Sequence, residues 1–317
     1  MVLCIALLIL GFALLIKGAD FFVDGASSTA SNFKVPKILI GLTIVAFGTS
    51  APELAVSMKA LASGDTDMVL GNVIGSNILN ILLILGVAAV IRPMIIHKNT
   101  IRKEIPIAIL VSSLLVVLFL DIELQSGEVD QITRSDGIAI LLFFAVFLYY
   151  LIMTAMRDKG KNSVEKPKWP LLPSLLFMGV GLAGIIFGAD LVVNNATELA
   201  KQLGVSERVI SLTIIAFGTS LPELVTTIVS AKKGEMDLIL GNVLGSNIFN
   251  ICVVLGVPVA IFGTVTPGSF QVIDLVMLVG SAFLLFIFSL TQHKISRKEG
   301  IALLAAFFAY YAAVIIM

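Results

Sequence analysis

The chain has 317 residues, of which 58% are hydrophobic and 13% are charged. Soluble globular proteins carry about 25% charged residues, so this composition leaves too little polar surface to cover a soluble core. The mean hydropathy is +1.06, and the formal net charge of zero argues against a nucleic-acid partner, which would need a basic surface.

Long uncharged segments predict membrane-spanning helices. Residues 68–91 and 238–273 contain no Asp, Glu, Lys or Arg, and each exceeds the roughly 20 residues that cross a bilayer. The apolar runs are continuous, which favours helices over an alternating β-barrel pattern. We expect the first run to be retained as a span, because it lacks the basic start and the cleavage site of a signal peptide. The ten predicted spans lie near 2–27, 37–62, 68–91, 104–120, 135–156, 171–199, 206–231, 238–262, 270–290 and 299–316.

Lys and Arg are distributed unevenly among the predicted loops. With the N-terminus outside, sixteen of them fall in inside loops and four, Lys59, Arg134, Lys201 and Arg208, fall outside. Because basic residues favour cytoplasmic loops, both termini are expected on the extracytoplasmic side. The acidic loop at 121–136 then lies outside.

The two halves of the sequence repeat one another. Residues 38–81 align with 208–251 at a constant offset of 170, and 24 of the 44 positions are identical. Ala46 to Leu54 reads AFGTSAPEL where 216–224 reads AFGTSLPEL, and GNVIGSNILN at 71–80 matches GNVLGSNIFN at 241–250.

Five spans in each half is an odd number, so the second copy must enter the membrane inverted. Inverted repeats are typical of secondary transporters, whose binding site lies at the repeat interface near the bilayer midplane. The predicted fold is therefore an all-α membrane protein of ten transmembrane helices in two inverted five-helix repeats. The first repeat covers 1–156, a cytoplasmic linker covers 157–170, and the second repeat covers 171–317.

Two glutamates interrupt the apolar spans. An ionised side chain at mid-membrane costs about 2.5–3.5 kcal/mol on insertion scales, and no Lys or Arg lies near Glu53 or Glu223 in sequence. A bound cation is a natural counter-charge, and two carboxylates balance one divalent ion. We expect these glutamates to ligate a cation or to transfer protons.

Short oxygen-bearing side chains surround both glutamates in sequence. Thr49 and Glu53 are four residues apart, which predicts one shared helix face, and the spacing recurs for Ser76 with Asn80 and in the second repeat. Pro52 and Pro222 cannot bond the carbonyls four residues earlier, so both helices are expected to break there. Such hard oxygen donors suit calcium or sodium, whereas zinc or copper would need His or Cys.

A structural role is the alternative for most of these residues. Any single Gly, Ser or Pro in a membrane helix commonly serves packing or a kink, and a lone intramembrane Asn can bond between helices. Asp20 and Asp190 recur at the same offset of 170. For them a structural cap or gate is as good an interpretation as a role in transport.

The duplicated motifs resemble the sodium/calcium exchanger family of the cation/calcium exchanger superfamily, in particular its compact prokaryotic members. The family's two alpha repeats carry GTSxPE followed by a GSNI-type motif, and both occur twice here, at 38–81 and 208–251. The resemblance implies a sodium/calcium antiporter, not an enzyme, that works by alternating access in a prokaryotic plasma membrane. It implies calcium and sodium as transported ions in a lipid bilayer, and no cofactor. We expect a monomer, because a membrane core complete in one chain suits one.

The resemblance also implies a set of site residues. Glu53, Glu223, Thr49 and Thr219 would bind calcium. The sodium sites would use Ala46, Thr49, Ser50 and Ser76, and in the second repeat Ala216, Thr219, Ser220 and Ser246. Asn80 and Asn250 would complete the central site. Many relatives, including the potassium-dependent branch, carry Asp where this chain has Asn250, which argues against potassium co-transport and leaves the stoichiometry open.

Three other functions are alternatives to sodium/calcium exchange. A calcium/proton antiporter could use the same two glutamates, although the hydroxyls of the GTSxPE motifs favour sodium. A passive cation channel is a second alternative, and saturable exchange of bound ions, which a channel lacks, would distinguish the two. An intramembrane protease is disfavoured, because His97 and His293 lie in predicted loops and Asp20 and Asp190 lack the Gly-x-Gly-Asp context.

Overall fold

The computed structural model describes residues 2–120, 130–158, 166–204, 216–266 and 272–316. Within these residues the chain is helical except for two short strands and one isolated bridge. Six helices are long and apolar enough to cross a membrane, or seven if the pair Lys37–Thr49 and Ala51–Ala62 forms one span. The chain is thus an all-helical membrane protein, as the composition predicts.

The six long helices coincide with six predicted spans. They are Val2–Phe33, Thr66–Ile91, Arg134–Arg157, Leu171–Gln202, Met236–Phe262 and Val272–Leu290. At 104–120 the structure has a 16-residue helix, about 24 Å long at 1.5 Å per residue, and at 299–316 it has a 20-residue helix with three charged residues in its first turn. The count of ten spans therefore stays a prediction.

Some predicted features lie outside the described residues. They include residues 121–129 of the acidic loop, residues 159–165 of the linker, the start of the seventh span at 206–215 and the start of the ninth at 270–271.

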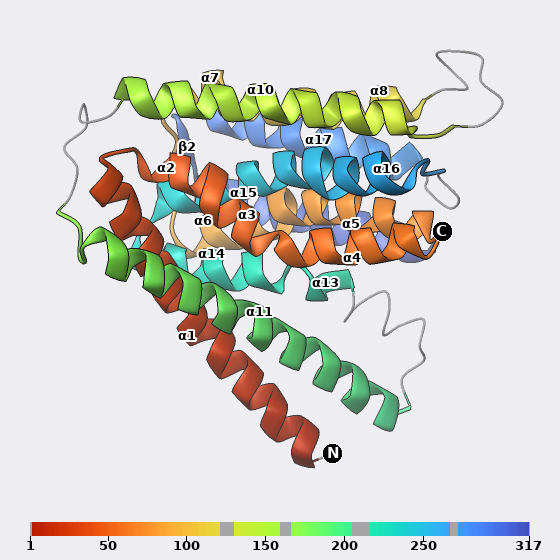
Figure 1. Cartoon of the computed structure of the whole chain (residues 1–317), viewed down its shortest axis with the longest axis horizontal. Coiled ribbons are helices and arrows are strands. Elements are labelled where there is room, and N and C mark those ends of the chain that lie inside the picture. The colour runs from red at the N-terminus through yellow and green to blue at the C-terminus, as the bar shows by residue number, and fades with distance from the viewer. Residues whose placement is uncertain (1, 121–129, 159–165, 205–215, 267–271, 317) are drawn as a thin grey trace. The chain divides into compact units, whose positions relative to one another are not determined.

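The helices divide into two compact units, and each is described by itself. The first unit, Met1–Pro52 with Arg157–Asn242, is built around two 32-residue helices, α1 and α11 (Figure 1). Its elements are α1 (Val2–Phe33), α2 (Lys37–Ile40), η1 (Gly41–Val45), α3 (Ala46–Thr49), α11 (Leu171–Gln202), α13 (Ala216–Gly218), α14 (Leu221–Lys233) and the start of α15 (Met236–Phe249).

Glycines let α1 and α11 pack backbone to backbone. A Cβ on Gly18 would lie 2.7 Å from the carbonyl oxygen of Gly181, and one on Gly188 would lie 2.7 Å from the backbone nitrogen of Leu15. Gly11, Gly18 and Gly25 are seven residues apart, so they fall on one helix face. Small residues of this kind allow close helix packing in a membrane, where little hydrophobic force acts between helices.

The second unit comprises Glu53–Met156 and Val243–Met317. It contains most of α4 (Ala51–Ala62) and α10 (Arg134–Asp158) and the second half of α15. Its other elements are α5 (Thr66–Leu79), η2 (Asn80–Ile84), α6 (Leu85–Ile91), β1 (Met94–Ile95), α7 (Lys98–Arg102), α8 (Glu104–Phe119), η4 (Asn250–Leu255), α16 (Gly256–Phe262), α17 (Val272–Leu290), β2 (Lys294–Ile295) and α18 (Arg297–Ile316).

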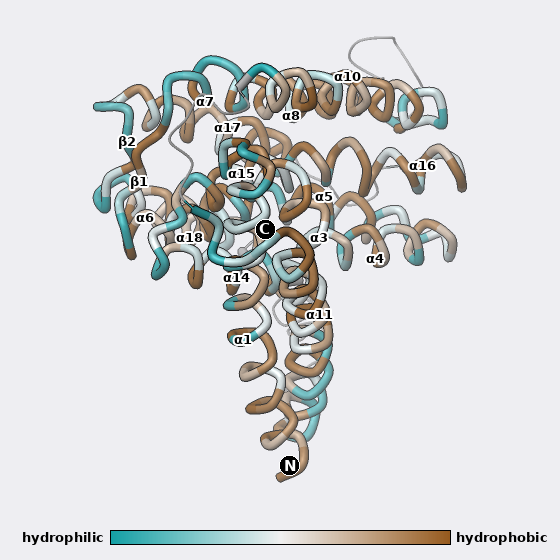
Figure 2. Tube along the Cα trace, turned by 60° about the vertical axis from the view of Figure 1, so that its left-hand side comes forward, coloured by the Kyte–Doolittle hydropathy of each residue, from teal (hydrophilic) through white to brown (hydrophobic). Residues whose placement is uncertain are grey.

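Large apolar side chains are exposed on the long helices α10 and α11. On α10, Leu142 is 64% and Val146 is 65% exposed, and on α11, Leu176 is 61% and Phe187 is 67% exposed. Figure 2 shows strongly apolar residues along much of α1 and α10. Many exposed large apolar side chains along one helix suit contact with lipid tails.

Candidate cation-binding residues

Both predicted helix breaks are present and have the same geometry. Ser50 ends α3 with φ −89° and ψ 8°, and Ser220 precedes α14 with φ −89° and ψ 4°. The prolines two residues later cannot donate to a carbonyl of the preceding turn, so the helix stops before them. One detail of the prediction is wrong: Thr49 and Glu53 lie on different helices, α3 and α4, and do not share one helix face.

The break places each glutamate in the first turn of a new helix. Glu53 lies in the first turn of α4, and Glu223 lies in the first turn of α14. Unpaired N–H groups and the helix dipole favour negative charge at this position. Both side chains are nearly inaccessible, at 1% and 2% exposure, so the local backbone offsets part of the cost of burying a carboxylate.

The first unit brings Glu223 next to the break of the other repeat. Ser50 Oγ donates a hydrogen bond to Glu223 Oε1 at 3.0 Å, and Thr49 Oγ1 donates to Asn242 Oδ1 at 3.1 Å. Glu223 Oε2 is buried and has no hydrogen-bond partner among the described residues. A buried carboxylate oxygen without a donor is costly, and a bound cation would remove that cost.

The second unit ties Glu53 to helix α5. Asn72 Nδ2 lies 2.9 Å from the backbone oxygen of Glu53 and 2.9 Å from Ser57 Oγ, and donates to both. The first turn of α4 is therefore anchored at the residue that carries the carboxylate.

Asparagines and π-helical turns line the rest of the second unit's polar interior. Asn80 Nδ2 donates to Asn247 Oδ1 at 3.0 Å. Asn80 begins the π-helix η2, and Asn250 begins the π-helix η4. Such π-turns inside α-helices are frequent at functional sites. In the described part of the chain, Asn80 Oδ1, Asn250 Oδ1 and Ser246 Oγ are buried without a hydrogen-bond partner.

The predicted site residues fall into both units. The first unit holds Ala46, Thr49, Ser50, Ala216, Thr219, Ser220 and Glu223, and the second holds Glu53, Ser76, Asn80, Ser246 and Asn250. Among those whose burial is described, nearly all are buried, Thr49, Ser50 and Ser246 completely so, whereas Thr219 is half-buried.

Four asparagines that bond to or beside these residues were missed by the sequence reasoning: Asn72, Asn77, Asn242 and Asn247. They stand at fixed positions in both copies of the GN-x-x-GSN motif, so their recurrence at an offset of 170 was the available signal.

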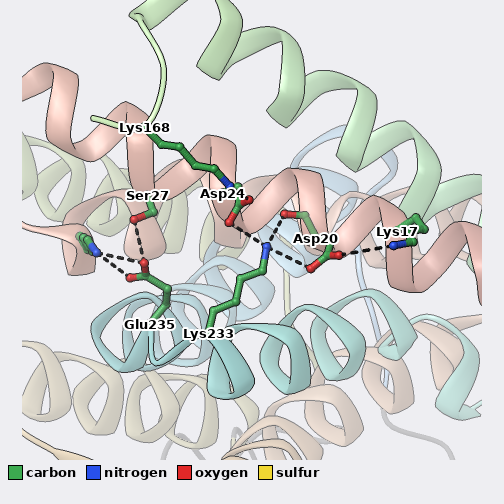
Figure 3. Close-up of polar contacts among 8 residues, drawn as sticks. Lys17, Asp20, Asp24, Ser27, Lys168, Lys233 and Glu235 are labelled. Atoms are coloured by element: carbon green, nitrogen blue, oxygen red, sulfur yellow. Dashed lines mark hydrogen bonds and ion pairs between the residues drawn. The ribbon is translucent and has the colours of Figure 1, made fainter. Parts of the chain in front are cut away.

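An ion-pair network involves Asp20, one of the two aspartates whose role the sequence left open (Figure 3). Lys233 Nζ lies 3.0 Å from Asp20 Oδ1 and 2.7 Å from Asp24 Oδ1, and Lys168 Nζ lies 2.7 Å from Asp24 Oδ2. Asp190 is exposed. Through Lys233, Asp20 joins α1 to the end of α14.

A second contact of the same kind lies beside this network. Lys37 Nζ approaches Glu235 Oε2 at 2.8 Å, and Ser27 Oγ donates to Glu235 Oε1 at 2.9 Å. Glu235 therefore links α1, the start of α2 and the turn after α14 (Figure 3).

The broken helices, the buried glutamates and the hard oxygen donors define a membrane protein of the ion-transporter class. Comparison with known proteins gives the family. The model of the sodium/calcium exchanger protein family matches residues 3–153 and 173–316. The chain belongs to the sodium/calcium exchanger family.

Individual relatives match most or nearly all of the chain. The inner membrane protein YrbG of Escherichia coli is 40% identical over 84% of this chain and 82% of its own. The putative antiporter CaxA of Alkalimonas amylolytica is 40% identical over 95% of each chain. The solved structure of the sodium-calcium exchanger NCX_Mj, soaked with 10 mM Na+ and 10 mM Sr2+, is 34% identical and has a TM-score of 0.83 over 100% of this chain and 98% of its own.

Proposed function

We propose that this protein exchanges sodium for calcium across the plasma membrane by alternating access. The observation that carries the proposal is the buried Glu223 carboxylate, which receives a hydrogen bond from Ser50 on one oxygen and has no partner for the other among the described residues. Hydroxyl, amide and carboxylate oxygens are the ligands of calcium and sodium. Membership of the family and the likeness to the sodium-calcium exchanger NCX_Mj support the same pair of ions.

The proposed ligands are those that the sequence predicts. Glu53 and Glu223 bind calcium together with Thr49 and Thr219, and Asn80 and Asn250 complete the central site. Sodium uses the oxygens of the flanking threonines and serines. The proposed sodium ligands are Ala46, Thr49, Ser50, Ser76, Ala216, Thr219, Ser220 and Ser246. Because the two ions share ligands, each excludes the other, and this exclusion couples their opposite movements.

Ten spans in two inverted repeats are part of the proposal. Support comes from matching contacts in the second unit. Gly86 of α6 packs against Gly300 of α18, where an added Cβ would lie 3.2 Å from the Gly300 oxygen. The equivalent Gly256 of α16 packs against Gly137 of α10, where the same distance is 3.3 Å.

Two backbone bridges follow the same pattern. Strand β1 pairs with β2, and Ile132 pairs with Val265. Strand β1 follows the third predicted span of the first half, and β2 lies between the fourth and fifth spans of the second half. Val265 and Ile132 repeat this relation with the two halves exchanged. Figure 1 shows β2 and the end of α16, which precedes Val265, at opposite ends of α17. Equivalent contacts at opposite ends of one helix are what an inverted repeat requires.

Localisation and assembly complete the proposal. The relative YrbG is named an inner membrane protein, which supports a plasma-membrane location. The distribution of Lys and Arg supports extracytoplasmic termini. We expect a monomer, because each half supplies ligands to a site within one chain.

A calcium/proton antiporter is the competing function. It would use the same two glutamates. The name of the relative CaxA, a putative antiporter, does not say which ions that protein exchanges. The hydroxyls of Thr49 and Ser50, which a proton carrier would not need as ligands, favour sodium.

Calcium uptake into liposomes tests the proposal. Vesicles loaded with sodium and diluted into sodium-free buffer should take up radioactive calcium, and Glu53→Gln and Glu223→Gln should abolish the uptake. Uptake that follows a proton gradient and ignores sodium would identify the proton antiporter. No calcium flux under either gradient would refute both functions.

A further inference from the structure

A residue of the second repeat orients the amide of Asn80. Asn80 Nδ2 donates to Asn247 Oδ1 at 3.0 Å, and Asn247 Nδ2 donates to the backbone oxygen of Asn77 at 3.3 Å. The side chains of all three residues are buried, with at most 2% exposure. The two amides thus form a series of hydrogen bonds that links α15 to Asn80 of η2 and to Asn77 of α5.

The direction of these hydrogen bonds fixes which end of the Asn80 amide is available to a cation. An asparagine amide has one oxygen acceptor and one nitrogen donor, and only the oxygen can ligate a hard cation. With Nδ2 committed to Asn247, Oδ1 is left buried and without a hydrogen-bond partner in the described residues. A reversed Asn80 amide would set its oxygen against the Asn247 oxygen, so Asn247 selects the orientation that offers oxygen.

The equivalent residue of the first repeat is engaged differently. Asn77 Nδ2 donates to the backbone oxygen of Val73, one turn earlier in its own helix, at 2.7 Å. Asn77 Oδ1 is buried and has no hydrogen-bond partner among the described residues. Asn77 therefore does not hold Asn250 as Asn247 holds Asn80, although the two repeats have the same sequence at these positions.

We propose that Asn247 is a positioning residue, which holds the Asn80 amide with its oxygen toward the transported cation. Asn77 has no such role, so the two central asparagines are not equivalent. This inference rests on the proposed function, because it assumes that Asn80 is a calcium ligand. Residues behind a metal ligand that fix its orientation commonly change metal affinity about 10- to 100-fold when removed.

The first test compares two repeat-related substitutions. Asn247→Leu and Asn77→Leu replace similar buried amides by a side chain of similar shape that can neither accept nor donate. We expect calcium binding to the purified protein, measured by isothermal titration, to weaken about tenfold or more in Asn247→Leu and clearly less in Asn77→Leu. Equal losses in both variants, or no loss in Asn247→Leu, would overturn the proposal.

The second test removes the need for orientation. In Asn80→Asp both carboxylate oxygens are acceptors, so either can face the cation whatever stands at position 247. We expect the loss caused by Asn247→Leu to fall to about twofold or less in the Asn80→Asp background, as non-additivity of contacting residues implies. A merely structural role of Asn247 would cost the same in both backgrounds, and that result would contradict the proposal.

Two further measurements separate a failure of the Asn247 proposal from a failure of the proposed function and from misfolding. The unsubstituted protein must bind calcium in the same titration, since its failure to do so would count against the proposed function and not against Asn247 in particular. If Asn247→Leu does not give a monodisperse protein, Asn247→Ser is put through both comparisons. Its shorter hydroxyl keeps a polar group in the helix but does not reach the position of Asn247 Oδ1.

Discussion

Ser50 donates a hydrogen bond to Oε1 of Glu223 across 173 positions of the sequence, at a donor–acceptor distance of 3.0 Å. The serine ends the helix α3 of the first repeat, and the glutamate lies in the first turn of α14 of the second. The broken helix of one repeat therefore orients the carboxylate of the other.

Ser50→Ala is expected to impair exchange without unfolding the protein. A hydrogen bond to a charged group contributes about 1.5–3 kcal/mol, so losing this donor should raise the calcium KM by about tenfold in the liposome assay. Ser281→Ala is the matched control, because Ser281 is buried and its hydroxyl donates to Leu278 of its own helix. Equal effects of the two substitutions would show that the bond to Glu223 is unimportant.

Gly181→Ala should destabilise the packing of α1 on α11. A Cβ at Gly181 would lie 2.4 Å from the backbone nitrogen of Phe22 and 2.6 Å from the oxygen of Gly18, both rigid backbone atoms. Overpacking costs about 1–3 kcal/mol or more, which should lower the melting temperature in detergent. Gly179→Ala on the same helix meets nothing within 4 Å and should not lower it. A melting temperature unchanged by Gly181→Ala would argue against this packing.

Asn72→Ala should loosen the first turn of α4. The substitution removes the donor to the Glu53 backbone and to Ser57, and an unsatisfied buried acceptor costs about 1–3 kcal/mol. We expect a lower melting temperature and weaker calcium binding together. The control is Asn195→Ala, since Asn195 donates to Leu191 within its own helix. A stable Asn72→Ala variant with unchanged calcium binding would count against an anchoring role.

Lys233→Met should cost more stability than Lys168→Met. Lys233 contacts Asp20 and Asp24 and has a side chain that is 25% exposed, whereas the side chain of Lys168 is 62% exposed and pairs with Asp24. Exposed pairs contribute about 0–1 kcal/mol, and hydrogen bonds to charged groups in less exposed positions contribute more. Thermal melting of the two variants at low and high salt would measure the stability that each loses. A larger drop in melting temperature for Lys168→Met than for Lys233→Met would contradict this ranking.

Local features of the fold and the site could be predicted from the sequence. The membrane class follows from composition, because apolar runs of about 20 residues have few other uses. The helix breaks at Ser50 and Ser220 follow from Pro52 and Pro222, because a missing N–H acts on the preceding turn whatever the tertiary structure. The repeat can be seen directly in the sequence, as identical residues at a constant offset of 170.

Partners across the chain could not be predicted in this way. The pairs Ser50–Glu223, Asn80–Asn247 and Asp24–Lys233 join residues that are 173, 167 and 209 positions apart. Two identical motifs give no sign that Asn247 bonds Asn80 while Asn77 bonds its own helix. The shared helix face predicted for Thr49 and Glu53 was wrong because the break falls between them.

The sequence by itself determined the membrane class, the duplicated motifs and the kinds of oxygen donor, because hydrophobicity, proline and side-chain chemistry act over a few residues. Only the tertiary structure decided which amide donates to which oxygen and which lysine pairs with Asp20 and Asp24. Those choices depend on how helices distant in sequence pack together, and a hydrogen bond forms only where the packing brings donor and acceptor within about 3 Å.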